Sequence, residues 1–118
     1  MTKINFAQFH TKDAANEGVM LKLTLPDGTP TEEWLHVVSQ DSDAYAKASA
    51  DLRKKMLKSD SFDEETSRLL SAHCVTGWSA EEPCTPEAVA TLLKNAPYIQ
   101  REVELLIYDT KRFFAARA

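Results

Sequence analysis

Two short stretches of alternating apolar and polar residues, joined by a turn sequence, constrain this fold most. In residues 19–25, Leu21, Leu23 and Leu25 fall on one face of an extended strand. Residues 33–38 suit a second strand, and the Pro-Asp-Gly-Thr-Pro segment between them favours a turn, because proline presets φ and glycine accepts positive φ. The pattern predicts a β-hairpin. A lone hairpin is marginal in water, so it must pack on other elements or pair with a further strand, for which residues 4–9 are a candidate.

Helical spacing dominates the rest of the chain. Residues 13–18 read as a connection that can include one helical turn. Apolar periodicity and capping residues predict four helices, over residues 41–59, 61–77, 85–96 and 97–116. Gly77 is expected to end the second of them in a left-handed conformation. The predicted class is therefore α+β, mainly α, with an N-terminal β-hairpin region (1–40), extended to three strands if 4–9 joins it, packed on about four helices (41–118).

Length and composition indicate one ordinary globular domain over residues 1–118. Hydrophobic residues make up 43% of the chain and charged residues 27%. The net charge of -4 argues against a general nucleic-acid binder or an anionic-membrane binder, since both need a cationic surface. No apolar run approaches the roughly 20 residues that span a bilayer, and the N-terminus has no signal-peptide core. A cytoplasmic location is expected.

The sequence offers little for catalysis or metal binding. The three glycines are too dispersed for a phosphate loop, and no Gly-x-Ser-x-Gly is present. His36 is read as a surface or half-buried side chain. His73 and Cys74 are helix neighbours that point about 100° apart, so Cys74 is read as a core residue. We expect no catalytic residues, no cofactor and no metal site.

The cysteines and the clustered charges have structural interpretations. Cys74 and Cys84 do not form a Cys-x-x-Cys pair, so two free thiols are favoured over a disulfide or a metal site. The acids at residues 60–65 suit the start of a helix. Asp109 and Arg112 have the spacing of a surface ion pair on a helix.

Apolar residues cover much of the girth of the last predicted helix. Such a helix is either central to the domain or presents a surface to partners. The hairpin raises the same question, because its free edge can accept another strand. The candidate protein-binding residues are Trp34, Leu35, Tyr108, Phe113 and Phe114. For Trp34 the alternative is an anchor that holds the hairpin on the helices. Exposed apolar surface also predicts weak self-association.

Four stretches, taken in order, resemble one protein family. The hairpin over 19–38 followed by Asp-Ser-Asp-Ala-Tyr at 41–45, Val-Thr-Gly-Trp-Ser at 75–79, the helix at 85–95 and Arg-Phe-Phe at 112–114 are similar to the tail assembly chaperones of long-tailed (siphovirus-like) bacteriophages and prophages. The resemblance covers most of the chain from about residue 15 onward.

That resemblance implies a protein that binds the tape-measure protein, keeps its apolar helices in solution and helps recruit tail-tube subunits. It implies action in the bacterial host cytoplasm and absence from the finished virion. A longer, frameshifted form is often made in the family. The alternative is a structural head–tail connector or tail terminator subunit that remains in the virion. A small enzyme or a metal-binding protein ranks third.

Overall fold

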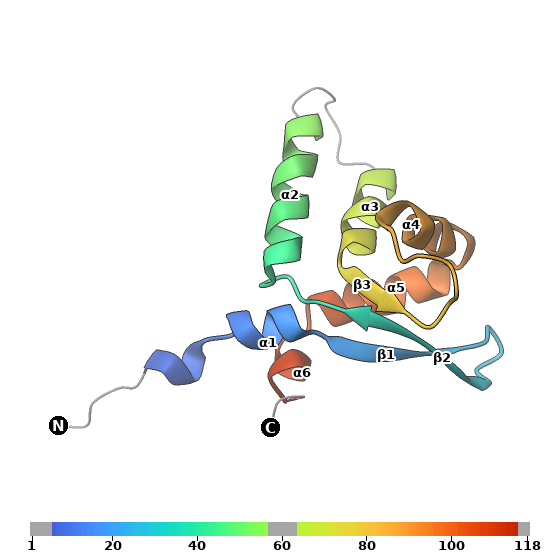
Figure 1. The fold of residues 1–118 in the computed structure, drawn as a ribbon, viewed down its shortest axis with the longest axis horizontal. Helices are drawn as coiled ribbons and strands as arrows, with labels where there is room; N and C mark the ends of the chain where they lie inside the picture. Colours follow the sequence, from blue (N-terminus) through green and yellow to red (C-terminus); the bar gives the residue numbers. More distant parts are fainter. Residues whose placement is uncertain (1–5, 57–63, 116–118) are drawn as a thin grey trace.

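The computed structural model describes residues 6–56 and 64–115 of the 118-residue chain. These residues form three strands, six α-helices and one 3-10 helix (Figure 1). In chain order the elements are η1 (Phe6–Phe9), α1 (Lys12–Glu17), β1 (Val19–Thr24), β2 (Pro30–Val37), α2 (Asp43–Met56), α3 (Glu64–His73), β3 (Val75–Trp78), α4 (Pro86–Asn95), α5 (Pro97–Ile107) and α6 (Thr110–Ala115). The predicted class, α+β with a majority of helix, is confirmed.

β1 and β2 pair antiparallel through a turn at residues 25–29. Lys22 lies opposite Trp34 in the register. In the turn, the Asp27 carboxylate accepts a hydrogen bond from the Thr29 amide at 2.9 Å, and Gly28 has a φ of +91°. The turn therefore depends on the Asp27 carboxylate as a hydrogen-bond acceptor and on Gly28 as the residue with positive φ.

The third strand comes from a segment that was expected to be helical. β3 pairs antiparallel with the free edge of β2, and Leu35 lies opposite Trp78 in the register, which gives the strand order β1-β2-β3. The predicted helix over 61–77 is wrong at its end, because the helix stops at His73. Residues 75–78 are β-branched or aromatic apart from Gly77, which favours a strand. The backbone of β2 supplies the hydrogen-bonding partner for this strand.

The main core lies between one face of the sheet and the helices α3, α4 and α5 (Figure 1). Leu35 and Val37 project from β2 into this core, at 1% and 0% exposure. The helices contribute Ala72, Val89, Leu93, Ile99, Val103, Leu106 and Ile107. Neighbouring strand residues point to opposite faces, so Trp34 and His36 lie on the other face of the sheet. A smaller cluster of Ala48, Leu52 and Leu70 joins α2 to α3.

The last predicted helix is divided in two. α5 ends at Ile107, and α6 begins at Thr110. Asp109 Oδ1 accepts a hydrogen bond from the Arg112 amide at 3.3 Å, which is the geometry of a helix N-cap. The expected surface pair of Asp109 and Arg112 is thus a backbone cap. The division turns α6 toward α1, with which it is in contact.

The candidate third strand at residues 4–9 is not formed by the described residues of that segment. Residues 6–9 form η1, and residues 4 and 5 lie outside the described part of the chain. The optional helical turn at 13–18 is present as α1. The predicted end of the first long helix near residue 59 and most of the capping sequence at 61–64 also fall outside the described residues. Within 6–56 and 64–115, no helix is long and apolar enough to cross a membrane.

Candidate protein-binding surfaces

The five candidate residues divide between the core and the surface. Leu35 and Phe113 are 1% and 2% exposed, so both belong to the core. Leu35 faces the helices because it alternates with Trp34 along β2. Phe113 is buried because α6 turns back against the body of the protein. Tyr108 and Phe114 remain 51% and 46% exposed.

Trp34 is half-buried on the face of the sheet away from the core. A methyl group added at Gly77 would lie 4.0 Å from Cζ3 of Trp34, which places the indole beside this glycine. The Trp34 amide donates to Ser79 Oγ at 2.9 Å, and the Ser79 amide donates to the Trp34 carbonyl at 3.1 Å. The backbone of Trp34 therefore joins β2 to the end of β3, and its side chain lies outside the main core.

Large apolar side chains are exposed at the end of α5, on α6 and on η1. Leu105 is 75% exposed, and Phe9 is 64% exposed. Phe9 and Phe114 line one groove between η1 and α6, of about 390 Å³, together with Thr11, Thr110 and Lys111. Leu105 and Tyr108 line a second depression, together with Arg101, Glu104 and Asp109. We call these two exposed apolar sites together, Phe9 with Phe114 and Leu105 with Tyr108, the apolar end.

Tyr108 is the one member of the apolar end with a fixed polar contact. Its Oη lies 3.0 Å from Oη of Tyr45 in α2, and the two rings meet edge to face at a centroid distance of 6.1 Å. Partial burial, and then this hydrogen bond, raise the pKa of Tyr108 above its ordinary value. The phenol is therefore neutral at physiological pH, and the apolar end carries no phenolate charge.

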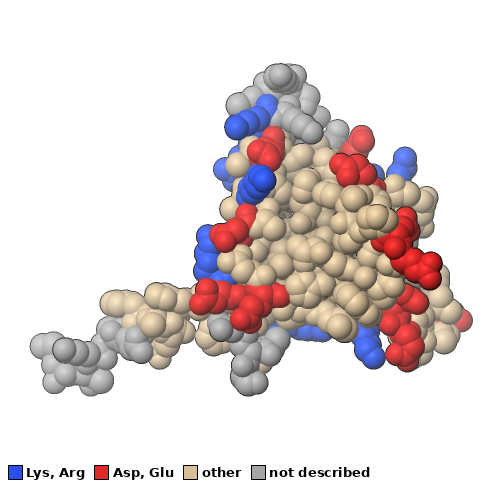
Figure 2. All heavy atoms as spheres, viewed as in Figure 1, with Lys and Arg blue, Asp and Glu red and all other residues tan. Residues whose placement is uncertain are grey.

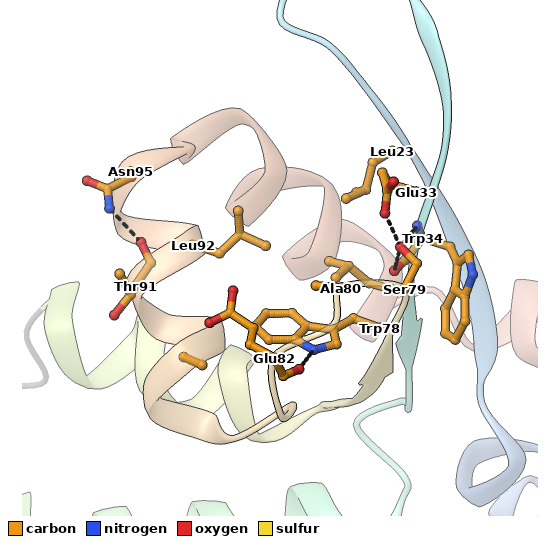
Figure 3. A pocket seen from close by; sticks show the side chains of 12 residues that line it. Leu23, Glu33, Trp34, Trp78, Ser79, Ala80, Glu82, Thr91, Leu92 and Asn95 are labelled. Carbon is orange, nitrogen blue, oxygen red and sulfur yellow. Dashed lines mark hydrogen bonds between the residues drawn. The ribbon is translucent and has the colours of Figure 1, made fainter.

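A groove of about 450 Å³ lies on the other side of the molecule, between the far half of the hairpin, the start of the β3–α4 connection and α4 (Figure 3). Leu35 and the half-buried Leu23 form its sheet side, and the half-buried Leu92 comes from α4. Trp78 lies between them, and its Nε1 donates to the Glu82 carbonyl at 2.8 Å. We call this the Trp78 groove.

The charged residues of the Trp78 groove have one sign. Glu33 and Glu82 line it, and none of its described lining residues is Lys or Arg. Among the exposed sequence neighbours of the lining residues, Glu32, Glu81 and Glu87 are acidic, and Lys22 and Lys94 are basic. Figure 2 shows Asp and Glu side chains gathered along the edge of the molecule that carries the end of the hairpin and the β3–α4 connection. The lining of the groove is therefore largely apolar, and its two charged residues are both acidic.

The residues considered for chemistry have structural surroundings. Cys74 is 0% exposed in the core, as predicted, and burial raises the pKa of its thiol to about 12. Cys84 is also a free thiol, and partial burial raises its pKa. His36 is half-buried, with Nδ1 2.7 Å from Thr76 Oγ1. In the described part of the chain no group of three or more His, Cys, Asp or Glu side chains is placed to hold a metal ion.

Sequence reasoning missed two contributors to these surfaces, Phe9 and Trp78. Phe6 and Phe9 were assigned to an optional strand, although their spacing of three residues is that of one helical face, and their rings lie 6.4 Å apart. Trp78 was placed beyond a helix end and instead lies in a groove beside β3. The β-branched and aromatic content of residues 75–78 was the signal that pointed to a strand.

Comparisons of this chain with protein-family models, with curated protein sequences and with solved structures gave no match.

Proposed function

We propose that this protein is a tail assembly chaperone of a long-tailed bacteriophage or prophage, and that it acts by binding other proteins and not by catalysis. Its partners are the tape-measure protein, whose apolar helices it keeps in solution, and the tail-tube subunits that it helps to recruit. It works in the cytoplasm of the bacterial host and is left out of the finished virion.

The apolar end is the observation that carries this proposal. Leu105 is 75% exposed and lines one depression with Tyr108, and Phe9 is 64% exposed and lines a second groove with Phe114. Apolar surface left in water costs about 25 cal/mol per Å² relative to its burial, so exposed apolar side chains of this kind are places where a partner gains binding energy. A chaperone for apolar helices needs a surface of this kind.

The order of the sequence motifs supports the same proposal. The hairpin, the helix start at 41–45, the Val-Thr-Gly-Trp-Ser segment and the helix at 85–95 follow one another as in the family that the chain resembles. In the fold, the segments 19–38 and 75–79 lie side by side in one sheet, and residues 86–95 form α4 next to them. Motifs far apart in the sequence thus build one region of the molecule.

The test is co-expression with the tape-measure and tail-tube proteins from the same genome. With this chain present, we expect the tape-measure protein to stay in the soluble fraction and to co-purify on a tag. The double variant Leu105→Ser/Phe114→Ser should return most of it to the pellet, because both substitutions remove exposed apolar surface. Met20→Ser/Leu25→Ser is the matched control, since these side chains are 51% and 50% exposed away from the apolar end.

Two results would contradict the proposal. One is a tape-measure protein whose solubility is the same with and without this chain. The other is a stoichiometric amount of this chain in purified virions by mass spectrometry, which is the result that a head–tail connector or tail terminator subunit gives.

A further inference from the structure

We infer that the Trp78 groove binds a partner segment that inserts an apolar side chain between α4 and the hairpin and places Lys or Arg residues beside Glu33 and Glu82. This inference rests on the proposed function and adds to it the chemistry of the partner segment. It concerns a surface separate from the apolar end, because the two share no lining residue.

The groove exists because the hairpin extends past the helices that cover the rest of the sheet. Leu35 is fully covered, Leu23 is half-buried and Leu25 is 50% exposed, so burial falls toward the turn. α4 begins at Pro86 and approaches this end of the sheet through Leu92. An apolar side chain from outside can therefore continue the core between Leu23 and Leu92 (Figure 3).

The walls of the groove are held in place before any partner arrives. The Trp78 indole donates a hydrogen bond to the Glu82 carbonyl. The Ser79 amide donates to the Trp34 carbonyl, and the Ser79 hydroxyl accepts from the Trp34 amide. On α4, the Thr91 hydroxyl and the Asn95 amide group bond to carbonyls of their own helix. A preformed apolar groove loses little conformational entropy when it is filled.

Charge decides which apolar segment fits. Glu33 and Glu82 are exposed at the groove, and neither forms an ion pair with a described residue. By contrast, the groove at η1–α6 contains Lys111, and the depression at Leu105 has both Arg101 and acids. A segment with Lys or Arg beside its apolar anchor is attracted to the Trp78 groove, and an acidic segment is repelled.

The test uses two labelled peptides with leucine at the same positions. All remaining positions are lysine in one peptide and glutamate in the other. Binding is measured by fluorescence anisotropy at low and at physiological salt. We expect the Leu/Lys peptide to bind, more weakly as salt rises, and the Leu/Glu peptide not to bind. Equal binding of both peptides, or binding of neither, would overturn the inference.

Two pairs of variants locate the binding. Glu33→Gln/Glu82→Gln should lower the affinity for the Leu/Lys peptide about 3- to 10-fold, which is the effect expected from the loss of two exposed ion pairs. Asp51→Asn/Glu65→Gln makes the same change in net charge on α2 and α3 and should shift affinity less than about 2-fold. Thr91→Trp fills the groove from an exposed helical position and should abolish binding, whereas Ala50→Trp on α2 should not.

The outcomes separate this inference from the proposed function. If the Glu variants and their controls behave alike, the groove does not read charge, and the inference fails while tape-measure binding through the apolar end can still hold. If the molar mass rises with protein concentration and Thr91→Trp abolishes that rise without any peptide, the occupant is a second copy of this chain, and the inference of a basic partner segment is wrong. Thermal melting of each variant establishes that it is folded.

Discussion

Gly18 joins α1 to β1 with a φ of +74°, a conformation that L side chains rarely adopt. A Cβ there would lie 2.5 Å from the Val37 carbonyl oxygen, so the backbone would have to move. Gly28 has a φ of +91° but nothing within 4 Å of an added Cβ. Gly28→Ala should cost about 1 kcal/mol of unfolding free energy from φ alone, and Gly18→Ala should cost more. Urea denaturation of both variants checks this order, and equal losses would contradict it.

Cys74 gives a pH dependence whose sign follows from its burial. Its pKa is raised from 9.0 to about 12 in the folded protein, so above pH 9 the unfolded chain loses a proton that the folded chain keeps. The free energy of unfolding should therefore fall as pH rises from about 9 toward 12, by up to about 1.4 kcal/mol per pH unit.

Cys74→Ala should make this decline shallower, whatever its effect on stability at neutral pH. Cys84→Ala is the matched control. Burial raises the pKa of both thiols, and Cys84 is less buried than Cys74. Chemical denaturation at several pH values between 8 and 11 measures both slopes. Parallel curves for wild type and Cys74→Ala would show that the thiol is not the group responsible.

At the scale of elements, α4 shows how a local sequence positions a surface. The Thr85 hydroxyl accepts a hydrogen bond from the Ala88 amide at 3.1 Å, and Pro86 occupies the first helical position. Thr85→Ala should cost about 1 kcal/mol, since it leaves the amide without its cap. Thr91→Ala in the same helix should change stability by less than about 0.5 kcal/mol, because Thr91 is exposed and its hydroxyl bonds only to a helix carbonyl. Thermal melts of both variants test the contrast.

At the scale of the whole molecule, exposed apolar side chains at the apolar end predict self-association. We expect the apparent molar mass to rise above the 13.2 kDa of one chain as concentration increases. Leu105→Ser/Phe114→Ser should weaken this rise, and Met20→Ser/Leu25→Ser should leave it nearly unchanged. Sedimentation equilibrium provides the measurement. A constant mass for all three proteins would show that the apolar end does not drive association.

Where sequence reasoning failed, a nonlocal partner decided the structure. Residues 75–78 continue a helical pattern and also suit a strand, and the free edge of β2 selected the strand. The break after Ile107 has a local signal in Asp109, a good N-cap residue, but an apolar stripe that continues through Phe113 concealed it. The candidate residues divided for a similar reason, since Leu35 and Phe113 are apolar like their neighbours and their burial depends on which face meets the helices.

The sequence by itself determined the hairpin's turn, the start of α4 and the mainly helical α+β class. Each of these depends on short-range chemistry: a proline that presets φ, a threonine that caps a helix, or apolar residues at a fixed spacing. Only the tertiary structure decided the third strand, the turn of α6 against α1 and the two apolar surfaces. Those features arise from contacts between residues far apart in the chain, and local propensity does not specify which distant segment will be the partner.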